Sequence, residues 1–402
     1  MGNIVNEELV HEEVQKAITA ADDLATGGKL NAAQSDRFID YVIDETVLKQ
    51  NARTVRFRNE TLNIDKIGIG RRAAVPKVEA KDPGVRRGIT TSQVPLTPSE
   101  VMVPIEISDN FRELNIEGDN VTDTIIRLFA TQLANDLEEL YLIGDTVGPA
   151  VLEGDIVDSG STTLYIKDSY LALQNGWQKL ADGGHLVDAL GLNIGASVFS
   201  QALRAMPTKF RRNRKNLRFF MSPDLAQLYA EKLSTRATKG GDDAMAGMII
   251  TPFGVPIVEV PLWDFQPKQV EHVALPGTTV VALKYKNIVD VVVLPETLDD
   301  TPTTPFISGT DYTLDAAAGT IARDGGGSIG DGDTVKVTYG ASPQIMLTHM
   351  NNFIVGIGRD VRIEKDRDIY KTVDQYAITA KVAVQIEEVD AIVKVYNIGT
   401  GV

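Results

Sequence analysis

The sequence contains no cysteine, and this absence removes several kinds of chemistry at once. Without cysteine among its 402 residues, the chain forms no disulfide, no thiolate metal site and no thiol nucleophile. Histidine is nearly as scarce, and none of the four has a carboxylate at metal-ligand or catalytic spacing. These four are His11, His185, His272 and His349. We therefore predict no metal site and no cofactor, and we interpret the histidines as core or solvated residues.

Long apolar runs are missing as well. No stretch approaches the ~18 consecutive apolar residues that a membrane-spanning helix needs. The first twenty residues are acidic and lack the apolar run of a secretory signal. We expect a soluble protein that is made inside the cell and has no membrane partner.

The usual motifs of enzymes are also absent. The chain has no G-x-S-x-G elbow, no Walker loop and no H-E-x-x-H. Gly68-x-Gly70 lacks the third glycine of a dinucleotide site. The run Gly325–Asp333, GGGSIGDGD, is similar to calcium-binding turns, but plain hairpin turns are the favoured interpretation. We predict no catalytic residues, and no enzymatic activity.

Positive charge is in deficit overall, yet it gathers in two segments. The net charge of −15 argues against nucleic-acid binding by the whole surface. Residues 51–98 nevertheless carry ten basic and four acidic residues, which gives +6 (10 minus 4). The arginines proposed there as contacts between subunits are Arg53, Arg56, Arg58, Arg71, Arg72, Arg86 and Arg87. The second basic cluster comprises Lys209, Arg211, Arg212, Arg214, Lys215 and Arg218. This cluster can contact phosphates or form salt bridges within or between chains, and the sequence leaves both roles open.

One long helix dominates the predicted secondary structure. Residues 120–144 have an N-cap residue at Asn120, an acidic first turn at Asp123 and a glycine stop at Gly144. Apolar side chains recur there at helical spacing, as at Leu133 and Leu137. At about 1.5 Å per residue, the helix is roughly 35 Å long and can cross a whole domain.

The rest of the chain predicts an α+β protein. Residues 1–51 are expected to form two acidic amphipathic helices, and residues 52–103 an extended two-stranded loop. Further predicted elements are a strand at 101–107, a hairpin at 151–166, helices at 168–180, 196–206 and from Ser222-Pro223 onwards, a buried strand at 219–221, and strands at 255–260, 280–283, 288–294, 361–364, 377–386 and 391–396. The run 288–294 is expected to be buried on both faces. Residues 295–342, rich in Thr, Pro, Gly and Asp, are expected to form a separate inserted β-rich module.

The order of these features resembles the major capsid proteins of tailed bacteriophages, which have the Hong Kong 97-like fold. Residues 37–72 are similar to the end of the family's N-terminal arm and its extended E-loop, and residues 120–145 to its spine helix. Residues 206–224 with 254–263 are similar to the passage into the axial domain, and residues 368–398 to the closing segment of the peripheral domain. The resemblance covers nearly the whole chain except the module at 295–342.

The resemblance implies a division into domains. It implies an N-terminal arm at 1–51, an E-loop at 52–103, a peripheral domain at 104–215, an axial domain at 216–294 that returns at 343–367, and a closing peripheral segment at 368–402, with the inserted module at 295–342.

The resemblance also implies a function in the virion. Copies of the chain would form hexamers and pentamers of an icosahedral shell around double-stranded DNA, bound without sequence specificity and assembled in the host cytoplasm. Further implied partners are a portal, a scaffolding protein and a decoration protein. Two alternatives stay open: an encapsulin-type compartment of the same fold that encloses protein cargo, and a non-assembling nucleic-acid-binding protein.

Overall fold

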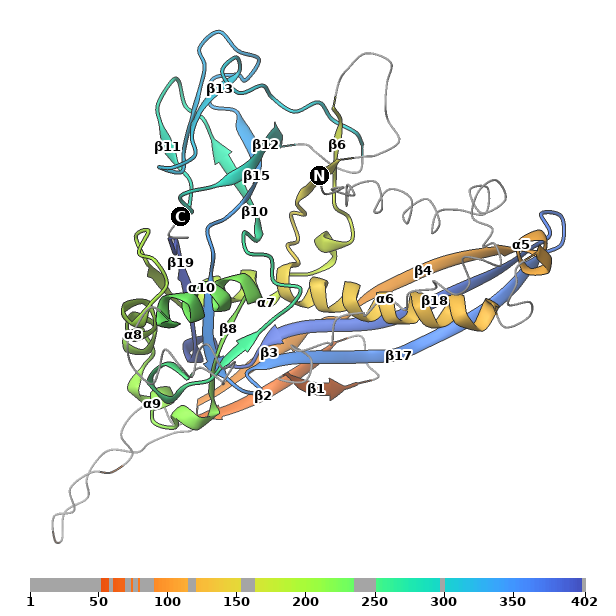
Figure 1. Cartoon of the computed structure of the whole chain (residues 1–402), viewed down its shortest axis with the longest axis horizontal. Helices are drawn as coiled ribbons and strands as arrows, with labels where there is room; N and C mark the ends of the chain where they lie inside the picture. The colour runs from red at the N-terminus through yellow and green to blue at the C-terminus, as the bar shows by residue number, and fades with distance from the viewer. Residues whose placement is uncertain are drawn as a thin grey trace, which may run out of the picture. The chain divides into compact units, whose positions relative to one another are not determined.

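The computed structural model describes residues 52–57, 61–68, 74, 79, 90–114, 121–152, 163–234, 251–296 and 301–399 (Figure 1). The predicted arm at 1–51 therefore lies outside the described residues. The chain divides into two compact units. Unit 1 comprises Met1–Thr46, Ser99–Glu138 and Gly358–Val382; unit 2 comprises Val47–Pro98, Glu139–Ile357 and Ala383–Val402.

Unit 1 is built on long antiparallel strands with a helix alongside. Strand β4 (Ser99–Ser108) pairs with β18 (Val373–Ile386), in a register that runs from Ser99 opposite Val382 to Ser108 opposite Val373. Strand β17 (Phe353–Asp368) is the other neighbour of β18. Helix α5 (Asp109–Leu114) follows β4, and its Phe111 N–H donates to Ser108 Oγ at 3.2 Å. Ser108 thus caps α5, which explains why the strand changes to helix at this residue.

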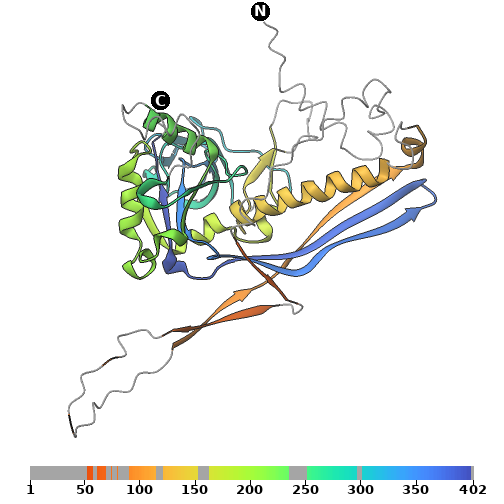
Figure 2. The same ribbon diagram turned by 60° about the horizontal axis from the view of Figure 1, so that its bottom comes forward.

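Helix α6 (Val121–Ile143) is the long helix predicted from the sequence, and it runs alongside these strands in both views (Figures 1 and 2). Leu133, Leu137, Leu140 and Tyr141 are buried, at the spacing that predicted the helix. Helix α6, β17 and β18 all continue from unit 1 into unit 2.

Unit 2 contains a five-stranded sheet in the order β7-β19-β16-β8-β9. The strands are β7 (His185–Asp188), β19 (Ile392–Tyr396), β16 (Ile345–His349), β8 (Leu217–Met221) and β9 (Ile257–Glu259). Helices α8 (Ala196–Ala205) and α10 (Pro223–Ser234) share one apolar core with this sheet. Phe199 of α8 lies edge-on to Phe219 of β8, with ring centroids 4.8 Å apart. The predictions of a buried strand at 219–221, of a helix at 196–206 and of a helix from Pro223 are confirmed.

A β-rich module occupies the other part of unit 2. One three-stranded sheet has the order β10-β15-β12 and the other β11-β14-β13. Their bounds are β10 (Lys268–Ala274), β11 (Val281–Ala282), β12 (Val289–Pro295), β13 (Tyr312–Asp315), β14 (Thr320–Arg323) and β15 (Thr334–Gly340). Both sheets contribute to one core, in which Val293, Tyr312, Ile321 and Val337 are buried.

This pairing corrects the predicted boundary of the module. The sequence placed the insertion at 295–342, but β15 pairs along its whole length with β10, and β14 pairs with β11. Strands between 268 and 295 therefore belong to the same module. The prediction that 288–294 is buried on both faces is also wrong, because Asp290 is exposed and Val291 and Val292 are half-buried. A one-sided strand suits a three-stranded sheet with one face on the core.

The predicted helix at 168–180 is interrupted in the structure. A 3-10 turn η2 (Leu171–Leu173) is followed by extended backbone at Gln174, and α7 (Trp177–Leu180) begins only after Gly176. Gly176 N–H donates to Gly144 O at 2.7 Å, and a Cβ on Gly176 would lie 2.7 Å from the Leu142 backbone. The close approach of the two backbones breaks the helix.

The predicted limits of the peripheral and axial regions do not follow the strand pairing either. Strand β7, from the predicted peripheral region 104–215, and β19, from the predicted closing segment 368–402, lie in one sheet with β8 and β16. Short elements complete the described chain: β1 (Arg53–Arg56), β2 (Leu62–Gly68), β3 (Thr90–Leu96), β5 (Ala150–Leu152), β6 (Tyr165–Lys167), η3 (Ala181–Gly183), α9 (Thr208–Arg211), η4 (Arg214–Asn216), η5 (Pro252–Gly254) and η6 (Val389–Ala391).

Candidate assembly interface

The predicted extended loop begins as a two-stranded hairpin. Strands β2 and β3 pair antiparallel from Leu62 opposite Leu96 to Gly68 opposite Thr90 (Figure 2). The side chains described along β2 and β3 are exposed or half-buried until Leu96, which is fully buried at the base. A hairpin with so little buried apolar surface is marginal by itself, so its base must fix its direction.

The base of this hairpin is anchored by a small apolar cluster. Phe57, Leu96, Ile354 and Ala383 are buried together. Strand β1 pairs in parallel with the first residues of β17, and Phe57 N–H donates to Ile357 O at 3.1 Å. The chain is therefore held on both sides of the loop before and after it leaves the body of unit 2.

Two ion pairs lie at the same base. Arg53 Nη1 is 3.1 Å from Glu387 Oε2, and Lys66 Nζ is 3.5 Å from Glu388 Oε2. Both pairs are partly exposed, and such pairs contribute about 0–1 kcal/mol to stability. They orient the loop more than they stabilise the fold.

The seven arginines predicted as subunit contacts fall into two groups. Arg53 and Arg56 are on β1 and exposed, and Arg53 pairs with Glu387 of its own chain. The others, Arg58, Arg71, Arg72, Arg86 and Arg87, lie outside the described residues. The structure therefore leaves their role as a prediction.

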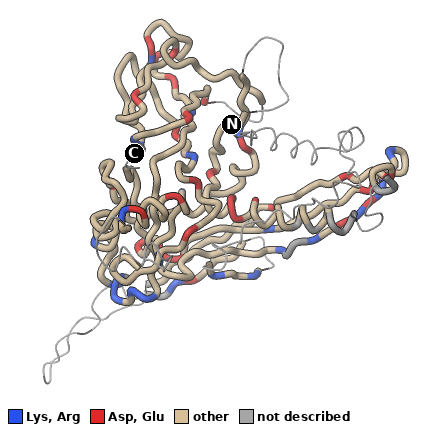
Figure 3. Tube along the Cα trace, viewed as in Figure 1, with Lys and Arg blue, Asp and Glu red and all other residues tan. Residues whose placement is uncertain are grey.

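The second predicted cluster is brought together by α9 and η4, just before β8. All six cations are exposed or half-buried, and Lys and Arg gather on this part of the tube in Figure 3. Three arginines donate to main-chain carbonyls. Arg211 Nη1 lies 3.0 Å from Leu203 O, Arg214 Nη1 3.3 Å from Phe253 O, and Arg218 Nη1 2.7 Å from Lys215 O.

The charges of unit 1 are arranged differently, because they neutralise one another. Glu100 pairs with Arg359 and with Lys381, Asp109 with Arg367, and Asp374 with Lys365. The pKa of Glu100 lies below its usual value, chiefly because of its hydrogen bond with Arg359. At the turn that joins β17 to β18, Ile369 is 77% exposed and Tyr370 is fully exposed.

A buried charge network joins the β-rich module to the five-stranded sheet. Lys394, on β19, is fully buried, and its Nζ lies 2.8 Å from Asp182 Oδ1, 3.0 Å from Gln178 O and 3.0 Å from Tyr285 OH. Lys284 of the module reaches the other oxygen of Asp182 at 2.5 Å. Burial lowers the pKa of Lys394 to about 8. Burial alone would raise the pKa of Asp182, but the two ammonium groups together hold it below its usual value.

The sequence reasoning missed this network, although one signal was present. Lys394 interrupts an apolar strand, Ile392-Val393-Lys394-Val395-Tyr396, at a position where a charge must find a buried partner. Its partners Asp182 and Lys284 are more than 100 residues away along the chain, which no local pattern can indicate.

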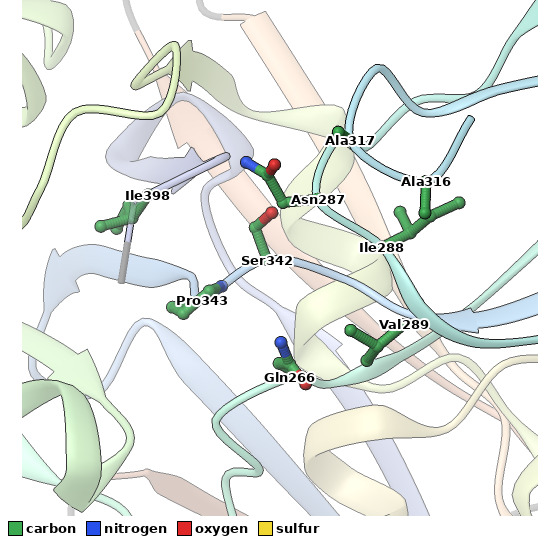
Figure 4. A pocket seen from close by; sticks show the side chains of 9 residues that line it. All are labelled: Gln266, Asn287, Ile288, Val289, Ala316, Ala317, Ser342, Pro343 and Ile398. Carbon is green, nitrogen blue, oxygen red and sulfur yellow. The ribbon is translucent and has the colours of Figure 1, made fainter. Parts of the chain in front are cut away.

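A cavity of about 330 Å³ opens beside the module, and Figure 4 shows the side chains that line it. Ser342 Oγ donates to Lys286 O, so this hydroxyl is occupied by the main chain. No lining residue is ionisable, so the cavity offers no acid, base or charged anchor for a ligand. They are Gln266, Asn287, Ile288, Val289, Ala316, Ala317, Ser342, Pro343 and Ile398.

Other sites were sought across the described part of the chain. No group of three or more His, Asp or Glu side chains there is arranged to hold a metal ion. In the Gly325–Asp333 segment and its neighbours, carboxylates accept main-chain N–H groups instead. Asp333 Oδ2 accepts from Gly330 at 2.8 Å, and Asp311 Oδ1 accepts from Ser328 at 2.8 Å. Among the described helices, none is both long and apolar enough to cross a membrane.

A comparison with curated proteins finds a relative along nearly the whole chain. The chain is 28% identical over 389 residues to a protein of Bacillus subtilis (strain 168) described as "Putative prophage capsid protein YqbE". The match covers 96% of this chain and 98% of the relative. This chain is thus related to a prophage capsid protein. The capsid resemblance predicted from the sequence is confirmed by this similarity, and the α+β class by the structure. No family model matches the chain.

Solved structures with a similar course of the chain are shell proteins. A subunit of the satellite phage P4 procapsid has a TM-score of 0.49 and 10% identity, and covers 98% of both chains. A Mycobacterium phage Bobi protein has a TM-score of 0.48 and 11% identity, covering 94% of this chain and 98% of its own. The holo-SrpI encapsulin complex of Synechococcus elongatus PCC 7942 has a TM-score of 0.46 and 8% identity, covering 93% and 97%. The relative found by sequence carries the proposal that follows.

Proposed function

We propose that this chain is a major capsid protein. Many copies form the hexamers and pentamers of an icosahedral shell, and the shell encloses double-stranded DNA without reading its sequence. The observation that carries the proposal is the similarity to a prophage capsid protein over 96% of the chain. The chain acts in the virion after assembly in the host cytoplasm, and it has no enzymatic activity.

The geometry supports an assembling protein. The β2–β3 hairpin leaves unit 2 from an anchored base, and a hairpin with exposed faces can bury surface only against another chain. Ile369 and Tyr370 add exposed apolar surface in unit 1. Stable subunit contacts bury on the order of 2,000–5,000 Å², which reaching loops and tips supply.

We assign the roles of the chain segments accordingly. Residues 1–51 are the arm, the loop based on β2 and β3 is the E-loop, and α6 is the spine helix. The β-rich module, now 268–340, is exposed on the shell and available to a decoration protein. A portal and a scaffolding protein are the other partners. The arginines of the loop, including Arg71 and Arg72, form ion pairs with acidic surface of neighbouring copies.

Expression of the chain alone tests the proposal, with size-exclusion chromatography and negative-stain microscopy as readouts. Shells, tubes or capsomer-sized rings are the expected result, and the 260/280 nm absorbance ratio reports enclosed nucleic acid. Shells that hold protein cargo and no nucleic acid would favour the encapsulin alternative. A chain that stays monomeric at high concentration, with crowding agent and with its scaffold supplied, would overturn the proposal.

Charge reversal tests the role of the loop. The double variant Arg71→Glu/Arg72→Glu is expected to stay folded by circular dichroism and to lose shell formation. The matched control is Lys268→Glu/Lys286→Glu, which reverses two exposed charges of the module and is expected to assemble. Normal shells from the loop variant would remove these arginines from the interface.

A further inference from the structure

The basic segment 209–218 carries six positive charges that the described chain does not neutralise. Lys209, Arg211, Arg212, Arg214, Lys215 and Arg218 occur within ten residues that contain no acidic residue. Among the described residues, no carboxylate lies within ion-pair distance of any of the six. Elsewhere the described cations find carboxylates readily, as Arg53, Lys284 and Arg367 do. On a chain of net charge −15, this unpaired concentration indicates an anion from outside the chain.

The guanidinium groups of this segment are held in place rather than free to move. Arg211, Arg214 and Arg218 each use Nη1 to donate to a main-chain carbonyl, at 2.7–3.3 Å. A guanidinium has five N–H donors, so each retains donors for a further partner. Such fixed forks lose little conformational entropy when they bind phosphate or carboxylate oxygens.

The segment itself is tied to the five-stranded sheet. His349 Nε2 lies 2.8 Å from Phe210 O, and Met350 N–H donates to Asn216 O at 2.8 Å. These bonds hold α9 and η4 at the end of β16, on the most extensively buried sheet of unit 2. The charges therefore sit on a rigid support.

The surface of the segment favours a polyanion over an acidic protein helix. The acidic arm 1–51 of another copy is the competing partner, with ten acidic and four basic residues. An amphipathic arm must also bury its apolar side chains, such as Leu9 and Val14. The exposed residues between the cations are polar, namely Thr208, Asn213 and Asn216. Phe210 is half-buried, with Lys209 Nζ over its ring at 4.9 Å. The segment thus offers charge and amide donors without an apolar groove, which suits a phosphodiester backbone.

We propose that the segment 209–218 contacts the phosphate backbone of the enclosed nucleic acid. This inference rests on the proposed shell function, because the shell supplies the nucleic acid at high local concentration. The contact is independent of base sequence, since no aromatic side chain of the segment is exposed for stacking and the donors face outward as cations. It places the segment on the inner surface of the shell.

The test compares salt dependence in three forms of the full-length chain, kept as dispersed subunits. The variant Lys209→Gln/Arg212→Gln/Lys215→Gln removes three cations that make no main-chain hydrogen bond given above. The control Lys268→Gln/Lys286→Gln/Lys371→Gln removes three exposed cations elsewhere. Binding to a fluorescent 30-base-pair duplex is measured by anisotropy between 50 and 200 mM salt. A synthetic peptide of residues 6–24 is the second probe.

Six phosphate contacts predict a loss of about a thousandfold in affinity across this salt range for the unmodified chain. The triple variant should lose only about fortyfold, because each lost contact reduces the slope of log K against log salt by about 0.9. The control should follow the unmodified chain. Equal slopes in all three forms would overturn the inference, and so would tight binding of the peptide without binding of the duplex.

Shell formation by the same three forms is scored separately by microscopy. Shells from all three, with unchanged DNA slopes, would overturn this inference and leave the proposed function standing. Absence of shells from every form, scaffold included, would overturn the proposed function and with it the placement of the segment inside a shell.

Discussion

Gly356 lies against the ring of Phe57 at the base of the E-loop. A Cβ placed on Gly356 would be 2.8 Å from Phe57 Cε1 and 3.1 Å from Ala383 Cβ. Real Cβ atoms do not approach a neighbour so closely, so the position requires glycine as long as Phe57 keeps its place. The direction in which the loop leaves unit 2 therefore depends on a residue almost 300 positions away in the sequence.

The first prediction is that Gly356→Ala displaces Phe57 and destabilises unit 2. Overpacking of this kind costs about 1–3 kcal/mol of unfolding free energy, measured by urea denaturation of dispersed subunits. The control is Gly325→Ala, where the nearest atom, Thr278 Cγ2, is 3.7 Å away. Adding Phe57→Leu to Gly356→Ala should cost less than the sum of the two single changes, because the ring no longer clashes. Additive effects would contradict the contact.

The second prediction concerns the start of α10. Ser222 is buried and its Oγ accepts a hydrogen bond from Leu225 N–H at 3.3 Å, immediately before Pro223. Ser222→Ala leaves this N–H without its acceptor, and loss of such a cap costs about 1 kcal/mol. Ser222→Thr retains the hydroxyl and should recover part of the loss. Ser234→Ala, at the exposed opposite end of α10, should change the urea midpoint little; a loss as large as that of Ser222→Ala would show that the cap is not the cause.

Local signals in the sequence were sufficient for elements that stand on their own caps and periodicity. The long helix was predicted for 120–144 and is found at Val121–Ile143, and α10 begins at the predicted proline. Gly144 was expected as a C-cap, and its N–H closes the last turn on Leu140 O at 3.1 Å. In both helices, cap, period and stop signal agree with one another.

Elements defined by distant partners were predicted less well. The module was placed at 295–342 because composition changes there, but β10 finds β15 some sixty residues later, and alternation does not name a partner. The helix expected at 168–180 is broken by contact between Gly176 and the end of α6. In the candidate interface, the basic residues were visible in the sequence. Their partners were not, because Glu387 lies 334 residues from Arg53.

The third prediction uses the buried ammonium group of Lys394. Burial lowers its pKa from 10.5 to about 8, although Asp182 opposes the shift. Between about pH 8 and 10.5 the unfolded chain therefore binds more protons at this lysine than the folded chain. Stability rises with pH wherever the unfolded state binds more protons, so the contribution of Lys394 increases across this window and is absent below it. The size is on the order of 1–3 kcal/mol.

Lys394→Met removes this titration and keeps the shape of the side chain. The difference in unfolding free energy between the unmodified chain and Lys394→Met should grow as the pH is raised from 7 to 10, measured by urea denaturation of dispersed subunits. Lys268→Met, which changes an exposed lysine, should show no such growth. Lys336, whose pKa burial also lowers to about 8, is present in all three forms and cancels from the comparison. A difference that stays constant or shrinks with pH would mean that Lys394 is not held as an ammonium group between Asp182 and Tyr285, and that the module is joined to the sheet by packing alone.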